Sequence, residues 1–408
     1  MKIEPIAREP HRVFFPLGIV LSVLGVALWP LHFCGWIDGW PMEAHARFMV
    51  LGFGGCFIAG FMGTAGPRMT GAFPWSCFEC LLFISLISVM AGLWWFQQIS
   101  VADGVGGFWL IGLTVSLVVR GIVGRSKLPP PGLFLVAAGW GGAAMAEFAL
   151  ALDVRCPLDP TWRTFWRLML FQGFLWLPLM GLIPLGLSRF WGQTSVHVQA
   201  QGNVRSWLRT GIPCWLAGGI LIFSIALEAM GSGRLGMVLR VVAVTLAFAF
   251  ALAETGWRKS GDAGEFALRW VPAAAAVGWL AATALPPLRI GLLHAMFIGA
   301  AGGAVLSVAT RVVLGQARGT DSDGRPMKGL KVVWGLLLFT AATRWTPEFV
   351  PKIRISHFNY AALVWSGTLV FWSWRLRSAL VTAHKNGSRK HRPLSRGERK
   401  RDRDQASA

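Results

Sequence analysis

Charged residues are scarce in this chain, and acidic residues are the scarcest. Only 14% of the 408 residues are charged, and 39 lysines and arginines stand against 19 aspartates and glutamates. Hydrophobic residues make up 54%, and the mean hydropathy is +0.53. This composition excludes an ordinary soluble domain and predicts an all-α, polytopic helical membrane protein. Because the apolar runs are continuous rather than alternating, a transmembrane barrel is excluded as well.

Apolar runs long enough to cross a bilayer recur along almost the whole chain, separated by short gaps. A helical crossing needs roughly 20 residues. We therefore expect about twelve transmembrane helices, near residues 13–33, 44–66, 76–97, 105–120, 132–152, 164–188, 209–229, 235–255, 267–285, 290–313, 330–347 and 356–376.

The connections between these runs alternate in charge, which predicts the orientation. The cation-rich set holds Lys2, Arg8, Arg12, Arg68, Arg120, Arg125, Lys127, Arg189, Arg205, Arg209, Arg258, Lys259, Arg318, Arg325, Lys328, Lys331 and the C-terminal tail. The other set is poorer in cations and holds Asp38, Glu43, Asp103, Asp153, Asp159 and Glu228. Since cations favour the cytoplasmic side, we expect both termini to be cytoplasmic.

The chain divides into a transmembrane domain, residues 1–380, and a basic tail, residues 381–408. We expect the tail to be disordered and cytoplasmic, and to touch anionic lipid of the bilayer. No nucleic-acid partner is expected, because the basic run has no interleaved aromatic residues for base stacking. Cys77 and Cys80 have C-x-x-C spacing, but they lie at the start of a predicted helix on the cytoplasmic side of the membrane, where conditions are reducing. Buried thiols are the favoured interpretation there, rather than a metal or redox site.

The second predicted helix carries an unusual polar face. Steps of three and four residues from His45 reach Met49, Gly52, Cys56 and Gly63, so an imidazole, a thioether and a thiol share one face with small residues. Small residues at this spacing allow another helix to approach closely, and a histidine at membrane depth suggests a partner or a ligand. The alternative is an interfacial histidine that bonds to a neighbouring residue.

Four histidines lie at the same predicted outer level of the membrane. His32 ends the first run, and His45, His294 and His357 open the second, tenth and twelfth. No two of them share one helix at ligand spacing, so any metal site would draw its ligands from different helices. The candidate metal ligands are therefore His45, His294, His357, His32 and the soft ligand Met49.

Two arginines stand where the outer face should be poor in cations. Arg47 follows His45 by two residues, and Arg289 precedes His294 by five. A buried anion such as a haem propionate would explain both as cofactor-binding residues. The alternative is ordinary pairing with Glu43 or with lipid headgroups.

Three separated stretches carry a resemblance to a known family. They are His11-Arg12-x-Phe14-Phe15-Pro16-Leu17-Gly18, the stretch from Glu43 to Gly71 that ends Thr64-Ala65-Gly66-Pro67-Arg68-Met69-Thr70-Gly71, and His294-Ala295 through Gly302-Gly303 to Thr310-Arg311 and Gly315-Gln316. Together they resemble the NnrS family.

The resemblance implies a multi-pass protein of the bacterial inner membrane that contains haem, here haem b, and copper, and that acts in the response to nitric oxide. By match, it supports His45 and His294 as cofactor ligands, and Arg68 and Arg311 as framework residues. The chain departs from the family pattern at the head of the second helix, where Glu43 replaces a histidine and Ala46 replaces the acid.

Three function classes stay open on the sequence. The first is a haem- and copper-binding membrane protein that meets nitric oxide or another small diatomic ligand in nitrosative stress. The second is a secondary transporter of a small molecule or a metal ion, and the third is an assembly factor or scaffold without a cofactor. Whether the protein is an enzyme stays undecided, because no complete catalytic constellation is visible. There is no adjacent histidine pair, and Tyr360 is the one tyrosine.

The head of the second run has an echo in the tenth. His45-Ala46-Arg47-Phe48 is matched by His294-Ala295-Met296-Phe297, and each opens a glycine-rich run. Second and tenth positions do not fit a repeat of two halves with six helices each, so the sequence gives the echo little weight.

Overall fold

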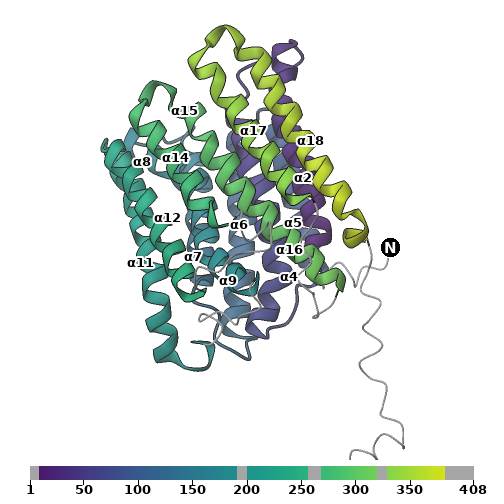
Figure 1. The fold of residues 1–408 in the computed structure, drawn as a ribbon, viewed down its shortest axis with the longest axis vertical. Helices are drawn as coiled ribbons and strands as arrows, with labels where there is room; N and C mark the ends of the chain where they lie inside the picture. The colour runs from purple at the N-terminus through teal and green to yellow at the C-terminus, as the bar shows by residue number, and fades with distance from the viewer. Residues whose placement is uncertain (1–8, 191–199, 256–267, 319–328, 382–408) are drawn as a thin grey trace, which may run out of the picture.

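The computed structural model describes residues 9–190, 200–255, 268–318 and 329–381. Over these residues every regular element is a helix, and Figure 1 shows long helices packed side by side. In chain order the elements are α2 His11–Phe33, α3 Met42–Arg47, η1 Phe48–Gly55, α4 Cys56–Thr70, α5 Cys77–Trp95, α6 Ile99–Ile122, α7 Leu133–Leu152, α8 Pro160–Leu168, η2 Met169–Gly173, α9 Phe174–Phe190, η3 Ala200–Gly202, α11 Val204–Ala229, α12 Gly233–Thr255, α14 Val271–Ala284, η4 Pro286–Leu288, α15 Arg289–Leu292, η5 Ala295–Gly302, α16 Gly303–Arg318, α17 Leu330–Phe349, η6 Pro351–Ile353 and α18 Arg354–Val381.

The all-α fold is confirmed, and each predicted run coincides with a helix. Within the described residues, nine helices are long and apolar enough to cross a membrane, so the chain is a multi-pass membrane protein. Twelve crossings and two cytoplasmic termini stay predictions. The predicted tail from residue 382 onward, with His384 and His391, lies outside the described residues, as does His197.

Three helices are interrupted by a π-helical segment. They are Met42–Thr70 with η1, Pro160–Ile183 with η2, and Pro286–Gly315 with η5, and they are the most buried of the candidate spans. π-helical turns are rare, and they occur often at functional sites. We call these three the central helices.

The helices fall into three successive groups of four, each with a central helix in second position. The groups are α2 to α6, α7 to α12 and α14 to α18. In each group the first helix packs on the central helix, and the third packs on the fourth. The fourth helix then packs on the first helix of the next group, at α6 with α7, α12 with α14, and α18 with α2. The three groups thus pack on one another in a closed cycle.

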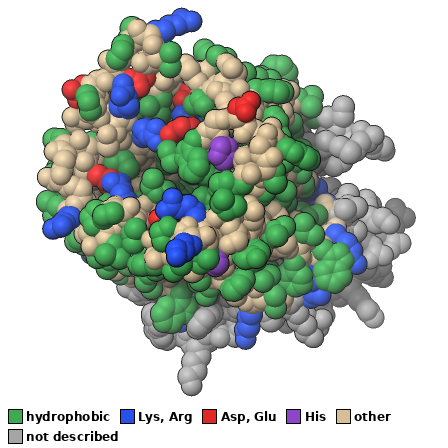
Figure 2. Space-filling model, turned by 90° about the horizontal axis from the view of Figure 1, so that it is seen from above, with side chains coloured by type: hydrophobic (Ala, Val, Ile, Leu, Met, Phe, Trp, Pro, Cys, Tyr) green, Lys and Arg blue, Asp and Glu red, His purple; other side chains and the backbone are tan. Residues whose placement is uncertain are grey.

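The bundle has two ends. We call the end that holds His32, His45, His294 and His357 the histidine end, where α2 ends and α3, α15 and α18 begin. Figure 2 looks onto this end, and it shows acidic and basic side chains interleaved with histidine among apolar side chains. We call the other end the Arg120 end. There α2 begins beside the end of α18, since Arg12 donates a hydrogen bond to the carbonyl of Leu380 at 2.6 Å.

Close packing of α2 on the first central helix positions the histidine end. A Cβ atom at Gly25 would lie 2.5 Å from the Cβ of Phe48, so only glycine permits this approach. Farther along the same contact, Phe15 stacks on Phe57 with ring centroids 4.6 Å apart. The approach brings the backbone of α2 within hydrogen-bonding distance of the head of the central helix.

Candidate functional site

His45 and His294 occupy equivalent places in the first and third central helices, each at the head of a π-helical segment. His45 lies in α3 just before η1, and His294 immediately precedes η5. The His45 Nδ1 lies 2.9 Å from the carbonyl oxygen of Gly25 on α2. The His294 Nδ1 lies 2.8 Å from the carbonyl oxygen of Ile290, one turn earlier on its own helix.

These backbone contacts fix the tautomer of both rings. A carbonyl oxygen only accepts, so Nδ1 of each histidine carries the hydrogen, and in the neutral ring Nε2 keeps a lone pair. Histidines that bind metals usually donate the second ring N–H to a carbonyl or carboxylate in this manner. Both imidazoles are half-buried rather than fully enclosed. The arrangement therefore presents two oriented, neutral nitrogen donors.

The structure brings His45 and His294 together from helices that are distant in the sequence. The charge of Arg344 on α17 acts on both imidazoles, and His45 and His294 also interact electrostatically with each other. Arg344 pairs with Glu348 at 2.7 Å and stacks over the Phe358 ring at 4.1 Å. One cation from the third group thus adjoins both imidazoles.

The other predicted ligands have neighbours of their own. His32 lies 3.3 Å from the carbonyl of Ile37, and its ring meets Trp40 edge-on at 5.5 Å. His357 bonds within its own helix, to the carbonyl of Ile353 at 3.2 Å. Their roles as ligands stay predictions.

Met49 lies one turn after His45, where Ser22 contacts its sulfur at 3.7 Å. Across the described ranges, no three His, Cys, Asp or Glu side chains come together in a group that could hold a metal ion. The role of Met49 as a metal ligand stays a prediction.

Arg47 lies at the centre of a group of charges beside His45, which we call the Arg47 cluster (Glu43, Arg47, Asp103, Glu147 and Arg167). Arg47, Asp103 and Glu147 are buried, and the other two are partly exposed. Its Nε and Nη2 donate to the two carboxylate oxygens of Asp103 at 2.5 and 2.6 Å. Its Nη1 donates to Glu43 at 2.7 Å, and Glu43 also pairs with Arg167 at 2.6 Å. Protein acceptors therefore meet all three guanidinium nitrogens of Arg47.

Arg289 also has a protein partner. It pairs with Glu228 on α11, which pairs in turn with the buried Arg240 at 2.6 Å. Arg240 reaches Gln172 in η2 as well, at 3.0 Å. Arg47 thus pairs with Glu43, as one sequence interpretation expected, and also with Asp103, whereas Arg289 pairs with Glu228, which neither interpretation named. Their roles as cofactor-binding residues stay predictions.

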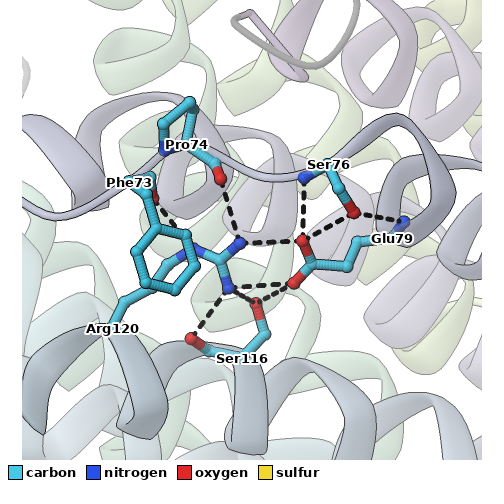
Figure 3. A network of polar contacts seen from close by, with 6 residues as sticks. All are labelled: Phe73, Pro74, Ser76, Glu79, Ser116 and Arg120. Atoms are coloured by element: carbon cyan, nitrogen blue, oxygen red, sulfur yellow. Dashed lines mark hydrogen bonds and ion pairs between the residues drawn. The ribbon is translucent and has the colours of Figure 1, made fainter. Parts of the chain in front are cut away.

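A separate polar network holds the Arg120 end together, and we call it the Arg120 network (Phe73, Pro74, Ser76, Glu79, Ser116 and Arg120). Figure 3 shows Arg120 of α6 reaching Glu79, the first-turn acid of α5, at 2.9 and 2.8 Å. Its other donors meet the carbonyls of Phe73 and Pro74, both at 3.1 Å. Glu79 completes a capping box with Ser76. Every group in this network is satisfied, so its role is structural.

The model of the NnrS protein family matches residues 5–384. The chain belongs to the NnrS family. The match spans both imidazoles, the Arg47 cluster and the Arg120 network, so all of these lie within the NnrS domain. A search of curated proteins finds no match to the chain.

Two residues at the histidine end of this NnrS protein were missed by sequence reasoning. Glu147 is fully buried in α7, and Arg344 adjoins both imidazoles. A signal for Glu147 was present, because it is the one charged residue of Leu133–Leu152, and ionisable residues inside apolar runs mark functional positions. Arg344 carried the same signal as Arg47 and Arg289, a cation at the predicted outer level, but it was not singled out with them.

Proposed function

We propose that this protein is an integral membrane protein of the bacterial inner membrane that binds haem b through His45 and His294 and acts in the nitric oxide or nitrosative stress response. One observation carries the proposal. Two imidazoles from different central helices interact with each other. In each ring Nδ1 donates to a backbone carbonyl, which leaves the lone pair of Nε2 available to bind a metal. The nitric oxide role rests on the family.

The donor chemistry fits haem iron better than a protein-only copper site. Haem iron takes one or two axial protein ligands, and histidine is the commonest of them. Copper held by protein alone requires a larger set, and the residues described here contain no group of three His, Cys, Asp or Glu suited to it. The case for copper therefore depends on two residues, His45 and the nearby thioether of Met49. When bound, haem supplies an iron that takes small diatomic molecules, while the two helices supply its orientation.

The test is optical spectroscopy of protein purified from a haem-replete host. The wild type should show a Soret band and a reduced-minus-oxidised spectrum that changes when nitric oxide is added. His45→Ala and His294→Ala should each abolish or shift the spectrum, whereas His32→Ala and His357→Ala, which change histidines at the same end, should leave it intact. Absence of both a Soret band and copper by elemental analysis would overturn the proposal.

A secondary transporter is the second candidate, and the buried charges favour it. Asp103, Glu147 and Arg240 lie fully inside apolar helices, a placement typical of ion pathways. Uptake into proteoliposomes discriminates between the two. Ion-dependent accumulation of a solute that Glu147→Gln abolishes would support transport, and its absence with a haem spectrum present would support the first proposal.

A further inference from the structure

Glu147 has a carboxyl group for which the surrounding protein supplies no donor. Its side chain is 0% exposed, and within the described part of the chain neither of its oxygens accepts a hydrogen bond. A buried carboxylate without donors or a bound cation is strongly disfavoured. Glu147 must therefore find compensation from something other than a protein donor.

A second acid lies beside Glu147. The carboxyl of Asp103, on the neighbouring helix α6, interacts with the carboxyl of Glu147 on α7. The approach depends on Gly106, where a Cβ atom would lie 2.5 Å from Glu147 Oε2. Two carboxylates cannot hydrogen-bond to each other, because both only accept. A bond between them needs one proton.

The surrounding charges leave an excess of acid. The two cations, Arg47 and Arg167, face three acids, Glu43, Asp103 and Glu147. Both oxygens of Asp103 already accept from Arg47, and Arg167 is bound to Glu43. One negative charge stays unmatched, and we assign it to Glu147, whose carboxyl accepts no hydrogen bond from either guanidinium.

We propose that Asp103 and Glu147 hold one proton between them at neutral pH, and that this carboxyl pair is a proton-exchange site of the protein. A metal cation is the less suitable occupant, because the described residues around the pair do not form a group of three metal-binding side chains. A shared proton needs only one oxygen from each of the two carboxyls.

Arg47 connects the proton to His45. It binds Asp103 and lies two residues from His45 on α3. The charge of a cofactor held by His45 and the proton of the carboxyl pair therefore influence each other through one guanidinium. This coupling rests on the proposed haem function, whereas the proton itself does not.

Infrared spectroscopy of the detergent-solubilised full chain tests the proton directly. Exposed aspartates and glutamates are ionised at pH 7, so a carboxylic-acid C=O band at that pH reports a buried, protonated group. The wild type should show one such band, which moves when the sample is exchanged into D2O. Glu147→Gln should remove it, and Asp103→Asn should change its frequency. Glu79→Gln, the matched control in the Arg120 network, should leave the band unchanged.

Three outcomes would overturn the proposal. First, the wild type could lack the band. This outcome is measured without any variant, so it does not depend on whether a variant folds. The band could persist at full intensity in Glu147→Gln, which would assign the proton elsewhere. Finally, sodium or potassium chloride could remove the band from the wild type, which would make the pair a cation site.

The coupling has its own readout in haem-loaded protein. The reduced-minus-oxidised infrared difference spectrum of the wild type should contain the carboxyl band, and that of Glu147→Gln should not. A loaded protein whose band does not respond to reduction would overturn the coupling alone. A protein that binds no haem but shows the band would refute the proposed function while upholding the proton site.

Discussion

The Arg47 cluster and the Arg120 network are each built around one buried arginine, yet they match charge differently. At the Arg120 end, one arginine meets one acid, and two serine side chains and three backbone carbonyls complete the set. At the histidine end, two arginines meet three acids, and the third acid, Glu147, has no donor. The comparison distinguishes a network that holds helices together from one that retains a binding capacity, here for a proton.

The largest expected difference concerns the two arginines. Arg47→Ala should cost about 3–5 kcal/mol of unfolding free energy, because it leaves buried carboxylates without their cation. Arg120→Ala should cost less, about 1.5–3 kcal/mol, since Glu79 is 25% exposed and keeps its bonds to Ser76. Thermal unfolding of both variants in the same detergent measures the difference. Equal losses would mean that the two sites do not differ in burial energetics.

Neutralising one acid at each end should lower the free energy of unfolding by unequal amounts. Glu79→Gln leaves Arg120 without its ion partner and should destabilise the protein by about 1.5–3 kcal/mol. Glu147→Gln replaces a carboxylic acid by an uncharged group of the same shape, whose amide can donate to Asp103. Its cost should stay under about 1 kcal/mol. A larger loss from Glu147→Gln than from Glu79→Gln, measured by thermal unfolding, would contradict a protonated Glu147.

Two glycines of α6 test how the packing around Glu147 depends on a residue without a side chain. Gly106→Ala should displace the Glu147 carboxyl and cost about 1–3 kcal/mol, the usual penalty of overpacking. Gly104 has no atom within 4 Å of the place where its Cβ would lie, so Gly104→Ala should be neutral or stabilise by up to about 1 kcal/mol. Unfolding curves of the two single variants provide the check. Equal stabilities would show that Gly106 does not make room for the carboxyl.

The smallest effect is expected at an exposed ion pair of the histidine end, which serves as a reference for both clusters. Arg163 donates to Asp153 at 2.6 and 2.9 Å, and these bonds lower the pKa of the Asp153 carboxyl. A lowered folded-state pKa contributes stability above the unfolded pKa, and this contribution is lost as the pH falls through the folded pKa. The difference in Tm between wild type and Asp153→Asn should therefore be small and constant at neutral pH and shrink in acid. A difference that grows in acid would contradict the pairing.

The positions of the helices could be predicted from the sequence because they depend on local properties. The run of apolar residues from Leu133 to Leu152 specifies a buried helix wherever it packs, and the Ser76–Glu79 capping box fixes the start of α5 within its own first turn. The depth of particular charges was harder to predict. Asp103 was expected in a connection, but it is a buried residue of α6, because Arg47 from another helix neutralises it there.

The candidate site was predictable only in part. Apolar context and the family resemblance indicated His45 and His294, and the structure places them as neighbours. The carbonyl of Gly25, which orients His45, could not be foreseen, because it depends on how closely α2 approaches the central helix. Glu43 was foreseen as a partner of Arg47, whereas Asp103 for Arg47 and Glu228 for Arg289 come from helices far along the chain and could not be foreseen.

The sequence by itself determined an all-α membrane protein, the approximate bounds of its helices and its NnrS character, since hydropathy, capping and motif are read from neighbouring residues. Tertiary structure alone decided that the helices form three groups of four, each of which contributes one central helix. That arrangement explains the echo between residues 45–48 and 294–297, which occupy second positions in the first and third groups. It also decided that Glu147 faces Asp103 rather than an arginine. The physical reason is that charge matching and ligand orientation arise from contacts between helices, and the order of residues within one helix does not encode them.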